Sequence, residues 1–214
     1  MVPARKSRYP KKVLNLIGNL GDRVIFQPEH REDRDQTFER VLALYPDMRV
    51  EMDEAGNISL MAPGSLESSA GSGEVFGQLR DWAKRDGTGK AYDATATFNL
   101  PNSAKMSPDA SWVPRSVLRA FTKKSLDTVT GVVIAPVFVA EVRSPSDLLK
   151  DQLKKCERWI RAGVREAWLV DPVEHKVHVF RPGRDVEVLA DPKQVKCTVL
   201  PGFVLKCKPI WEED

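Results

Sequence analysis

The sequence has few cysteines and no long hydrophobic run. Its three cysteines, Cys156, Cys197 and Cys207, are an odd number without CxxC spacing, so neither a disulfide framework nor a zinc ribbon is indicated. They fit a reducing compartment, and we expect a cytoplasmic protein. No apolar segment approaches the ~20 residues that a membrane-spanning helix requires, so we expect no membrane partner.

Histidine and nucleophile motifs are equally scarce. His30 lies in a charged segment, and His175 and His178 are three apart in a strand-like segment, where side chains alternate between the two faces. A zinc site built from histidines is therefore not expected. The segment 87–90 lacks the earlier glycine of a phosphate-binding loop, and Ser72 lacks GxSxG spacing, which disfavours a serine-type hydrolase.

Basic residues do not outnumber acidic residues in the chain after residue 21. The formal net charge is +3, but residues 1–21 carry five basic side chains and no acidic one, which leaves −2 for the remainder. Charge therefore gives no support for nucleic-acid binding by the remainder. The basic segment is typical of a flexible tail, of an arm that contacts phosphates or of an organelle-targeting peptide, and the tail is the favoured interpretation.

What the sequence does contain is a hydrophobic segment, residues 137–147, that predicts a buried strand followed by a helix start. Glu141 lies inside this segment, and burial of a carboxylate is costly unless the group is paired or binds a metal. Because side chains alternate along a strand, Glu141 and Arg143 share one face. A salt bridge between the two at a sheet edge is the alternative interpretation.

A second segment, residues 107–113, also predicts a strand with a carboxylate, Asp109. Two strands that each present a carboxylate beside apolar residues suit a hard divalent cation such as magnesium. Considered alone, Asp109 is better explained as a turn residue that follows a proline.

The helix expected after Asp147 offers a cation near these carboxylates. Its apolar stripe, at about 100° per residue, consists of Leu149, Leu153, Cys156 and Ile160. Most of its basic residues fall on the opposite side, but Lys155 borders Leu148 and Trp159 at the margin of the buried face. Lys155 can therefore reach back toward the sheet, and a lysine that merely extends into solvent is the alternative.

Hydrophobic periodicity and turn signals predict a single domain over residues 36–211, preceded by a basic tail and linker over residues 1–35. Helices are expected at 37–45, from the Gly- and Ser-rich stretch 63–73 to about 86, at 117–121 and after 147. Strands are expected at 48–52, 57–61, 92–100, 107–113, 137–142, 166–170, 177–179 and 186–188.

Several of these segments together resemble a known family. Ser107-Pro108-Asp109, the run from Glu141 to Asp147, Lys155 with Trp159, Ala162-Gly163-Val164 and the run from Trp168 to Pro172 have the order and spacing of the bacterial putative restriction endonuclease (Uma-type) family, which belongs to the PD-(D/E)XK nuclease superfamily. The resemblance extends from Met48 to Trp211. It implies an α/β fold of the restriction-endonuclease-like kind, with a mixed β-sheet flanked by helices.

The resemblance also implies a metal site. It assigns magnesium or manganese to the carboxylates of Asp109 and Glu141 and to the carbonyl of Val142. Nucleases of this fold often supply a further glutamate from the helix that ends near residue 86 or from its approach. Glu67 is closest to that position, with a solvated surface acid as the alternative interpretation.

Three further residues receive catalytic roles from the resemblance. The superfamily lysine two residues after the glutamate is replaced by Arg143, and Lys155 holds the helical position to which the lysine has moved in this family. Lys155 would orient the attacking water or stabilise the pentacoordinate phosphorus. Arg143 would contact phosphate or position Glu141, and Gln152, one turn before Lys155, would hydrogen-bond within the site.

The function implied is metal-dependent hydrolysis of phosphodiester bonds in nucleic acid, with DNA as the first expectation. A homodimer is expected by analogy with nucleases that cut both strands. The alternative, from a different class, is a nuclease-like fold that does not cut and serves as a nucleic-acid-binding or protein-interaction module.

Overall fold

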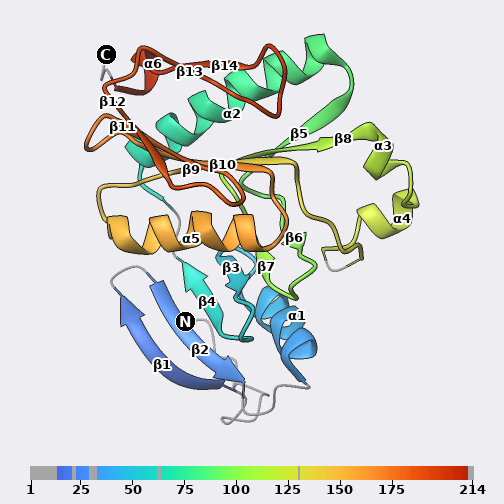
Figure 1. Cartoon of the computed structure of the whole chain (residues 1–214). Helices are drawn as coiled ribbons and strands as arrows, with labels where there is room; N and C mark the ends of the chain where they lie inside the picture. The colour runs from blue at the N-terminus through green and yellow to red at the C-terminus, as the bar shows by residue number, and fades with distance from the viewer. Residues whose placement is uncertain (1–13, 21–22, 29–32, 62–63, 130, 212–214) are drawn as a thin grey trace, which may run out of the picture. The chain divides into compact units, whose positions relative to one another are not determined.

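The computed structural model describes residues 14–20, 23–28, 33–61, 64–129 and 131–211 (Figure 1). The chain divides into two units, residues 1–62 and 63–214, each with its own internal contacts. The sequence predicted a boundary at residues 35 and 36, whereas the structure groups α1 and the hairpin after it with the N-terminal strands.

The first unit is an antiparallel sheet with one helix. Its strands β1 (Leu14–Leu20), β2 (Arg23–Pro28), β4 (Ile58–Met61) and β3 (Arg49–Met52) lie side by side in that order, and the helix is α1 (Arg34–Leu44). The predicted helix and hairpin are confirmed. A small core joins them, made of Phe38, Val41, Val50, Met52, Ile58 and Leu60.

A tail and linker are expected over residues 1–35, and residues 1–13, 21–22 and 29–32 of this range lie outside the described part of the structure. The described part of that range contains β1 and β2, which form a hairpin, and β2 also pairs with β4. A register irregularity between Leu16 and Gly18 interrupts the alternation of β1, so the strand pattern is not evident from the sequence. What stabilises it is pairing with β4, whose residues lie more than thirty positions further along the chain.

The second unit contains the central mixed sheet. Its six strands have the order β12 (Glu187–Ala190), β11 (Lys176–Phe180), β10 (Glu166–Asp171), β9 (Phe138–Val142), β8 (Ala110–Pro114) and β5 (Gly89–Asp93). Only β9 and β10 run parallel, and the connection between them passes through a helix, as parallel neighbours require. The expected mixed sheet is therefore present.

Helices cover both faces of this sheet (Figure 1). The long helix α2 (Leu66–Asp86) packs Val75, Leu79 and Trp82 against one face, in a core that also holds Phe138 and Ala140 of β9. On the other face, α5 (Leu149–Arg161) packs Cys156 and Trp159 against a core that includes Val139. The alternation predicted for β9 is confirmed, because residues 138, 140 and 142 face α2 and residue 139 faces α5.

Two boundaries differ from the sequence prediction for local reasons. The helix α2 begins at Leu66, since the Ser65 hydroxyl accepts a hydrogen bond from Ser68 N at 3.2 Å and so caps the helix inside the Gly- and Ser-rich stretch. The strand expected over 92–100 is interrupted, because Asp93 accepts hydrogen bonds from Thr95 N and Ala96 N, which turn the chain.

The remaining elements are short. They are β6 (Phe98–Asn99), β7 (Lys105–Met106), α3 (Arg115–Leu118), α4 (Lys123–Leu126), β13 (Gln194–Lys196), β14 (Val204–Lys206) and α6 (Lys208–Trp211). The β13–β14 hairpin was not predicted, because three residues are too few to show a period. Its Leu205 and the neighbouring Phe203 complete the core on the α2 side.

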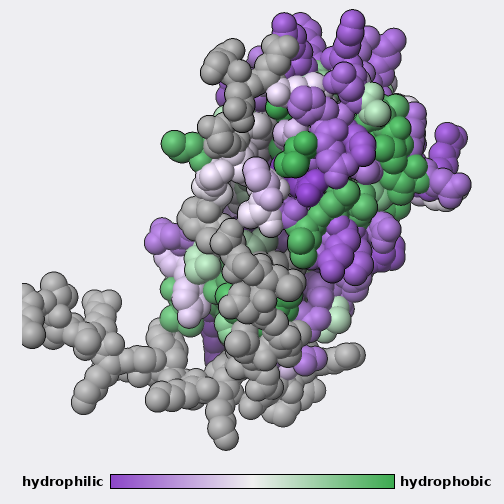
Figure 2. All heavy atoms as spheres, turned by 90° about the vertical axis from the view of Figure 1, so that its left-hand side faces the viewer, coloured by the Kyte–Doolittle hydropathy of each residue, from purple (hydrophilic) through white to green (hydrophobic). Residues whose placement is uncertain are grey.

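The face shown in Figure 2 carries mainly hydrophilic side chains where its atoms are coloured, with smaller apolar patches between them. Within the described part of the chain, no helix combines the length and apolar character that crossing a membrane would require.

Candidate functional site

The predicted site residues come from the junction of β8, β9 and α5. The register of β8 and β9 pairs Ala110 with Ala140, so one further step sets Asp109 beside Glu141. Opposite residues of an antiparallel pair point to the same face of the sheet, with Cβ atoms about 5 Å apart. Continued by one residue beyond the paired strands, this register places Asp109 opposite Glu141, which is 32 positions away in the sequence.

Asp109 is fixed by the backbone of β9. Its Oδ2 accepts a hydrogen bond from Val142 N at 2.7 Å. The N–H of Arg143 donates to β10, at Val170 O, so the backbone groups of Val142 point the other way, toward β8. The Val142 carbonyl thus faces the same side as its N–H group, which is the side where Asp109 lies.

Glu141 is buried, with 2 % of its area exposed, and each of its two oxygens has a hydrogen-bond partner. Its Oε1 accepts a hydrogen bond from Trp159 Nε1 at 2.6 Å, and its Oε2 accepts one from Lys155 Nζ at 3.0 Å. The ammonium is also 3.0 Å from Oε1. An unpaired carboxylate would be costly at this depth, and the indole and the ammonium together offset that cost.

Lys155 reaches the sheet as its position at the margin of the α5 apolar face predicted. Its Nζ also donates to the Ser107 carbonyl at 3.2 Å, so the ammonium connects the β9 carboxylate to the segment that leads into β8. The side chain is 11 % exposed. One cation is thereby held at the point where both predicted carboxylate segments meet.

The pKa of the adjacent Cys156 thiol is affected by the charges at this junction. Burial raises the pKa of its thiol well above the usual value, and Glu141 and Asp109 raise it further while Lys155 lowers it. A thiol whose pKa is raised in this way stays protonated and is a poor nucleophile. Cys156 therefore acts as a core residue, as the sequence indicated.

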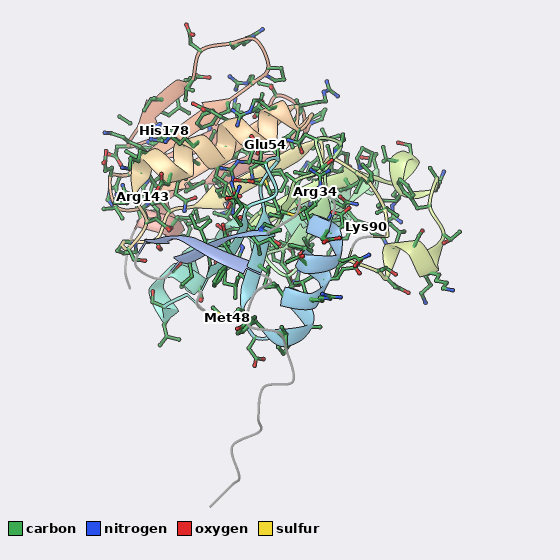
Figure 3. The ribbon with its side chains drawn as sticks, turned by 90° about the horizontal axis from the view of Figure 1, so that it is seen from below. Arg34, Met48, Glu54, Lys90, Arg143 and His178 are labelled. Carbon is green, nitrogen blue, oxygen red and sulfur yellow. The ribbon has the colours of Figure 1, made fainter. Side chains whose placement is uncertain are left out.

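Arg143 is engaged on a neighbouring contact. Its Nη1 lies 2.8 Å from Asp171 Oδ2 and 3.6 Å from Glu174 Oε1, and its Nε donates to the Asp147 carbonyl at 3.2 Å. Arg143 is labelled in Figure 3. Asp171 is completely buried and lies beside Arg143 across the parallel β9–β10 pair. The ion pairs of Arg143 thus go to Asp171 and Glu174, so the structure does not favour a Glu141–Arg143 salt bridge.

The acceptors of Arg143 were missed as site residues, although a signal existed. Asp171 ends a hydrophobic strand in the same manner as Glu141, and its Oδ1 accepts hydrogen bonds from Val173 N and Glu174 N. A hydrogen bond from Lys176 lowers the pKa of Glu174, and the charges of Lys176 and Arg143 lower it further. The result is a charged cluster at the carboxyl end of β10.

His178 lies at the edge of that cluster. His178, which is labelled in Figure 3, pairs with Leu169 of β10, and its side chain is on the α5 face of β11. The residue is 7 % exposed. Its Nε2 is buried without a hydrogen-bond partner among the described residues. Burial lowers the pKa of the imidazole, which keeps it neutral next to the Arg143–Asp171 pair.

Two predicted site residues are not joined to this arrangement. Gln152 is half-buried on α5, but its side chain forms no hydrogen bond with a described residue. Glu67 falls in the first turn of α2, and its side chain lies outside the described part of the structure. The structure therefore brings together Asp109, Glu141, Lys155 and the Val142 backbone.

The chemistry of these groups fits one hard cation with few protein ligands. Among the described residues, no three carboxylate, histidine or cysteine side chains form a metal-binding cluster. Magnesium, however, is commonly held by one or two carboxylates and keeps several waters. Asp109, Glu141 and the Val142 carbonyl supply oxygen donors of the type that magnesium and manganese accept.

The mixed sheet with a helix on each face, together with paired carboxylates and a lysine at the junction of β8, β9 and α5, defines an α/β protein of the restriction-endonuclease-like class. Residues 35–208 match the Uma2 family, whose description is putative restriction endonuclease, and the chain belongs to that family. The expected family is thus confirmed.

A solved structure agrees with this assignment. The crystal structure of a putative nuclease from Anabaena variabilis superimposes with a TM-score of 0.64 at 22 % sequence identity, covering 76 % of this chain and 89 % of that chain. At this identity the likeness establishes the fold. A comparison with curated proteins gives no match.

Proposed function

We propose that this protein is a magnesium- or manganese-dependent endonuclease that hydrolyses phosphodiester bonds of nucleic acid, with DNA as the first substrate to test. The observation that carries the proposal is the contact of Lys155 Nζ with Glu141 at 3.0 Å, with Asp109 held on the neighbouring strand by Val142 N. Membership of the endonuclease family supports the same reaction class.

The oxygen donors and the Lys155 ammonium have different roles in this proposal. Asp109, Glu141 and the Val142 carbonyl would hold the metal, which as a Lewis acid stabilises charge on the scissile phosphate. Lys155 places an ammonium beside Glu141, where it can donate a hydrogen bond to the attacking water or to a non-bridging phosphate oxygen. Trp159 holds the Glu141 carboxylate in one orientation through Oε1.

Lys155 suits this role better than Arg143. A guanidinium cannot lose a proton in a protein, whereas an ammonium is compact and its pKa can be tuned by its surroundings. Arg143 also donates hydrogen bonds to Asp171 and to the Asp147 carbonyl. We therefore assign Arg143 the positioning part of its predicted roles, because it holds the end of β9, and with it Glu141, against β10.

The proposal is tested by incubating supercoiled plasmid and single-stranded DNA with magnesium or manganese. Asp109→Asn and Lys155→Ala are expected to abolish cleavage. The matched controls are Asp185→Asn and Lys154→Ala, which alter an exposed aspartate and the exposed lysine next to Lys155. Equal cleavage by the wild type and by both site variants would refute the assignment.

The second candidate is a nuclease-like fold that binds nucleic acid or protein without cutting. It is favoured by one observation, namely that the side chain at the superfamily lysine position is paired with the buried Asp171. Manganese titration followed by calorimetry separates the two candidates, since the non-cutting module predicts no heat of binding. The homodimer stays a prediction, which light scattering on the purified protein measures directly.

A further inference from the structure

A second charged region lies at the opposite end of the central strands from the candidate site. An open cavity of about 590 Å³ is lined by three arginines, Arg165, Arg181 and Arg184, together with Glu187 and Thr198 among others. Arg165 immediately precedes β10 and Arg181 immediately follows β11. Asp171 and Arg143, by contrast, lie at the far ends of β10 and β9.

The charge of Arg181 is balanced by two glutamates. Arg181 Nε donates to Glu166 Oε2 at 2.9 Å, and its Nη1 donates to Glu187 Oε2 at 2.8 Å. Glu166 is completely buried, and it also accepts hydrogen bonds from the Trp168 indole and from the backbone and hydroxyl of Thr198. Glu166 and Glu187, the two carboxylates near the cavity, are therefore both paired with Arg181.

The other two arginines have no such partner. The side chains of Arg165 and Arg184 are exposed, and they form no hydrogen bond or ion pair with a described residue. Two guanidinium groups that line one cavity without a free carboxylate favour an anion between them. A planar guanidinium matches the oxygens of a phosphate group in bidentate fashion.

The local backbone holds these arginines in place. Arg181 and Arg184 are the first and last residues of a tight turn, in which Arg184 N donates to Arg181 O at 3.3 Å. Pro182 and Gly183 are its central residues, and Gly183 has φ +68°, as a type II turn requires at its third position. The backbone of Arg165 is held in place because its N–H donates to Val137 O at 3.1 Å. A rigid turn reduces the entropy lost on binding.

We infer that this cavity, defined by Arg165, Arg181 and Arg184, is a binding site for a phosphate group. The phosphate can belong to a small phosphate-bearing molecule or to the backbone of a nucleic acid, since the recognition chemistry is the same. The site stands apart from the proposed nuclease centre, so either can fail without the other.

Two ligand arms test the inference and distinguish the sources. Calorimetry measures binding of inorganic phosphate and pyrophosphate, and fluorescence anisotropy in EDTA measures binding of a short labelled single-stranded DNA. In at least one arm, the wild type is expected to bind and the double variant Arg165→Ala/Arg184→Ala to bind roughly tenfold more weakly or worse. Binding in the first arm alone indicates a free phosphate compound, and binding in the second alone indicates a backbone phosphate.

Matched variants keep the outcome interpretable. Arg85→Ala/Arg119→Ala removes two exposed arginines elsewhere in the same unit and is expected to bind like the wild type. Asp109→Asn should also retain binding, which separates this site from the nuclease centre. Thermal unfolding is recorded for every variant. If the alanine variant unfolds, Arg165→Lys/Arg184→Lys replaces it and is expected to bind more weakly than the wild type, because lysine cannot bind a phosphate group in bidentate fashion. The inference is overturned if no arm shows binding, or if the cavity variants bind as tightly as the wild type.

Discussion

Two buried glutamates on neighbouring parallel strands show how much the partners of a carboxylate decide. Glu141 of β9 and Glu166 of β10 are 2 % and 0 % exposed, and each accepts a hydrogen bond from a tryptophan indole. The cationic partner of Glu141 is the ammonium of Lys155, whereas that of Glu166 is the guanidinium of Arg181.

The surroundings of the two carboxylates differ in kind. Glu166 is saturated by Arg181, by its indole and by the Thr198 backbone and hydroxyl, so no lone pair is directed at a ligand site. Glu141 has Asp109 as its cross-strand neighbour, which adds a second oxygen donor. Burial of a carboxylate on a strand therefore does not define a site by itself. A second carboxylate nearby and a lysine as the cationic partner are what set Glu141, the proposed metal ligand, apart from Glu166.

The largest expected effect tests the functional half of this comparison. Glu141→Gln should reduce metal-dependent DNA cleavage by roughly three orders of magnitude, about 4 kcal/mol in the activation barrier, because a ligand and the charge beside Lys155 are both lost. Initial rates on supercoiled plasmid measure it. Cleavage within a few-fold of the wild type would mean that Glu141 is structural like Glu166.

The structural role of Glu166 is tested by Glu166→Gln. This substitution leaves Glu187 as the carboxylate paired with Arg181. We expect the free energy of unfolding to fall by about 3 kcal/mol, as measured by urea denaturation. Glu141→Gln should cost less, since Lys155 keeps the Ser107 carbonyl and some contact with solvent. The reverse order of stabilities would contradict the comparison.

The Arg143 contact is expected to contribute to stability through its geometry. Arg143→Lys should lower the free energy of unfolding by about 2 kcal/mol, because a lysine cannot contact Asp171 and the Asp147 carbonyl at once. The matched control is Arg161→Lys, at an exposed surface pair, which should change stability little. If both replacements cost the same, Arg143 is no more than a surface charge.

The two indoles provide a matched pair for metal binding. Trp159→Phe removes the donor to Glu141 and should weaken manganese binding by about tenfold in a calorimetric titration. Trp168→Phe removes the equivalent donor to Glu166 and should leave manganese affinity unchanged. An equal loss in both variants would indicate a general packing effect.

The smallest effect concerns His178. Its folded-state pKa lies below the unfolded value because of burial, so the unfolded chain takes up a proton first as the pH falls through about 6.5. Wild-type stability should therefore decrease between pH 7.5 and 5.5. His178→Leu should show a weaker pH dependence and be about 1 kcal/mol more stable, because an unpartnered imidazole nitrogen is removed. Urea denaturation at several pH values would show parallel curves if His178 does not contribute.

Much of the central sheet could be predicted because its inner strands are almost entirely apolar and buried. The segments around Glu141 and Glu166 were recognised as buried strands, and the helical position of Lys155 indicated that it could reach the sheet. The N-terminal strands could not be predicted in the same way. The alternation of β1 is interrupted between Leu16 and Gly18, and β2 pairs with β4, whose residues are distant in the sequence.

The site shows the same division. Asp109 and Glu141 were identified as carboxylates next to apolar strands, but their meeting depends on the β8–β9 register, which no local pattern encodes. The role of Arg143 could not be predicted, since its acceptor Asp171 is 28 positions away and only the parallel β9–β10 pair brings it close. Gln152 illustrates the opposite case, because it lies on α5 as predicted but its side chain forms no hydrogen bond with a described residue.

The sequence by itself determined which segments are buried and which charged residues lie among them, because burial follows from the local period of apolar side chains. Only the tertiary structure decided which of those charges pair. The register between strands and the packing of α5 on the sheet gave Glu141 a lysine and a neighbouring carboxylate, and gave Glu166 a guanidinium. Electrostatic energy depends on distances of a few ångströms between residues far apart in the chain, and folding alone sets those distances.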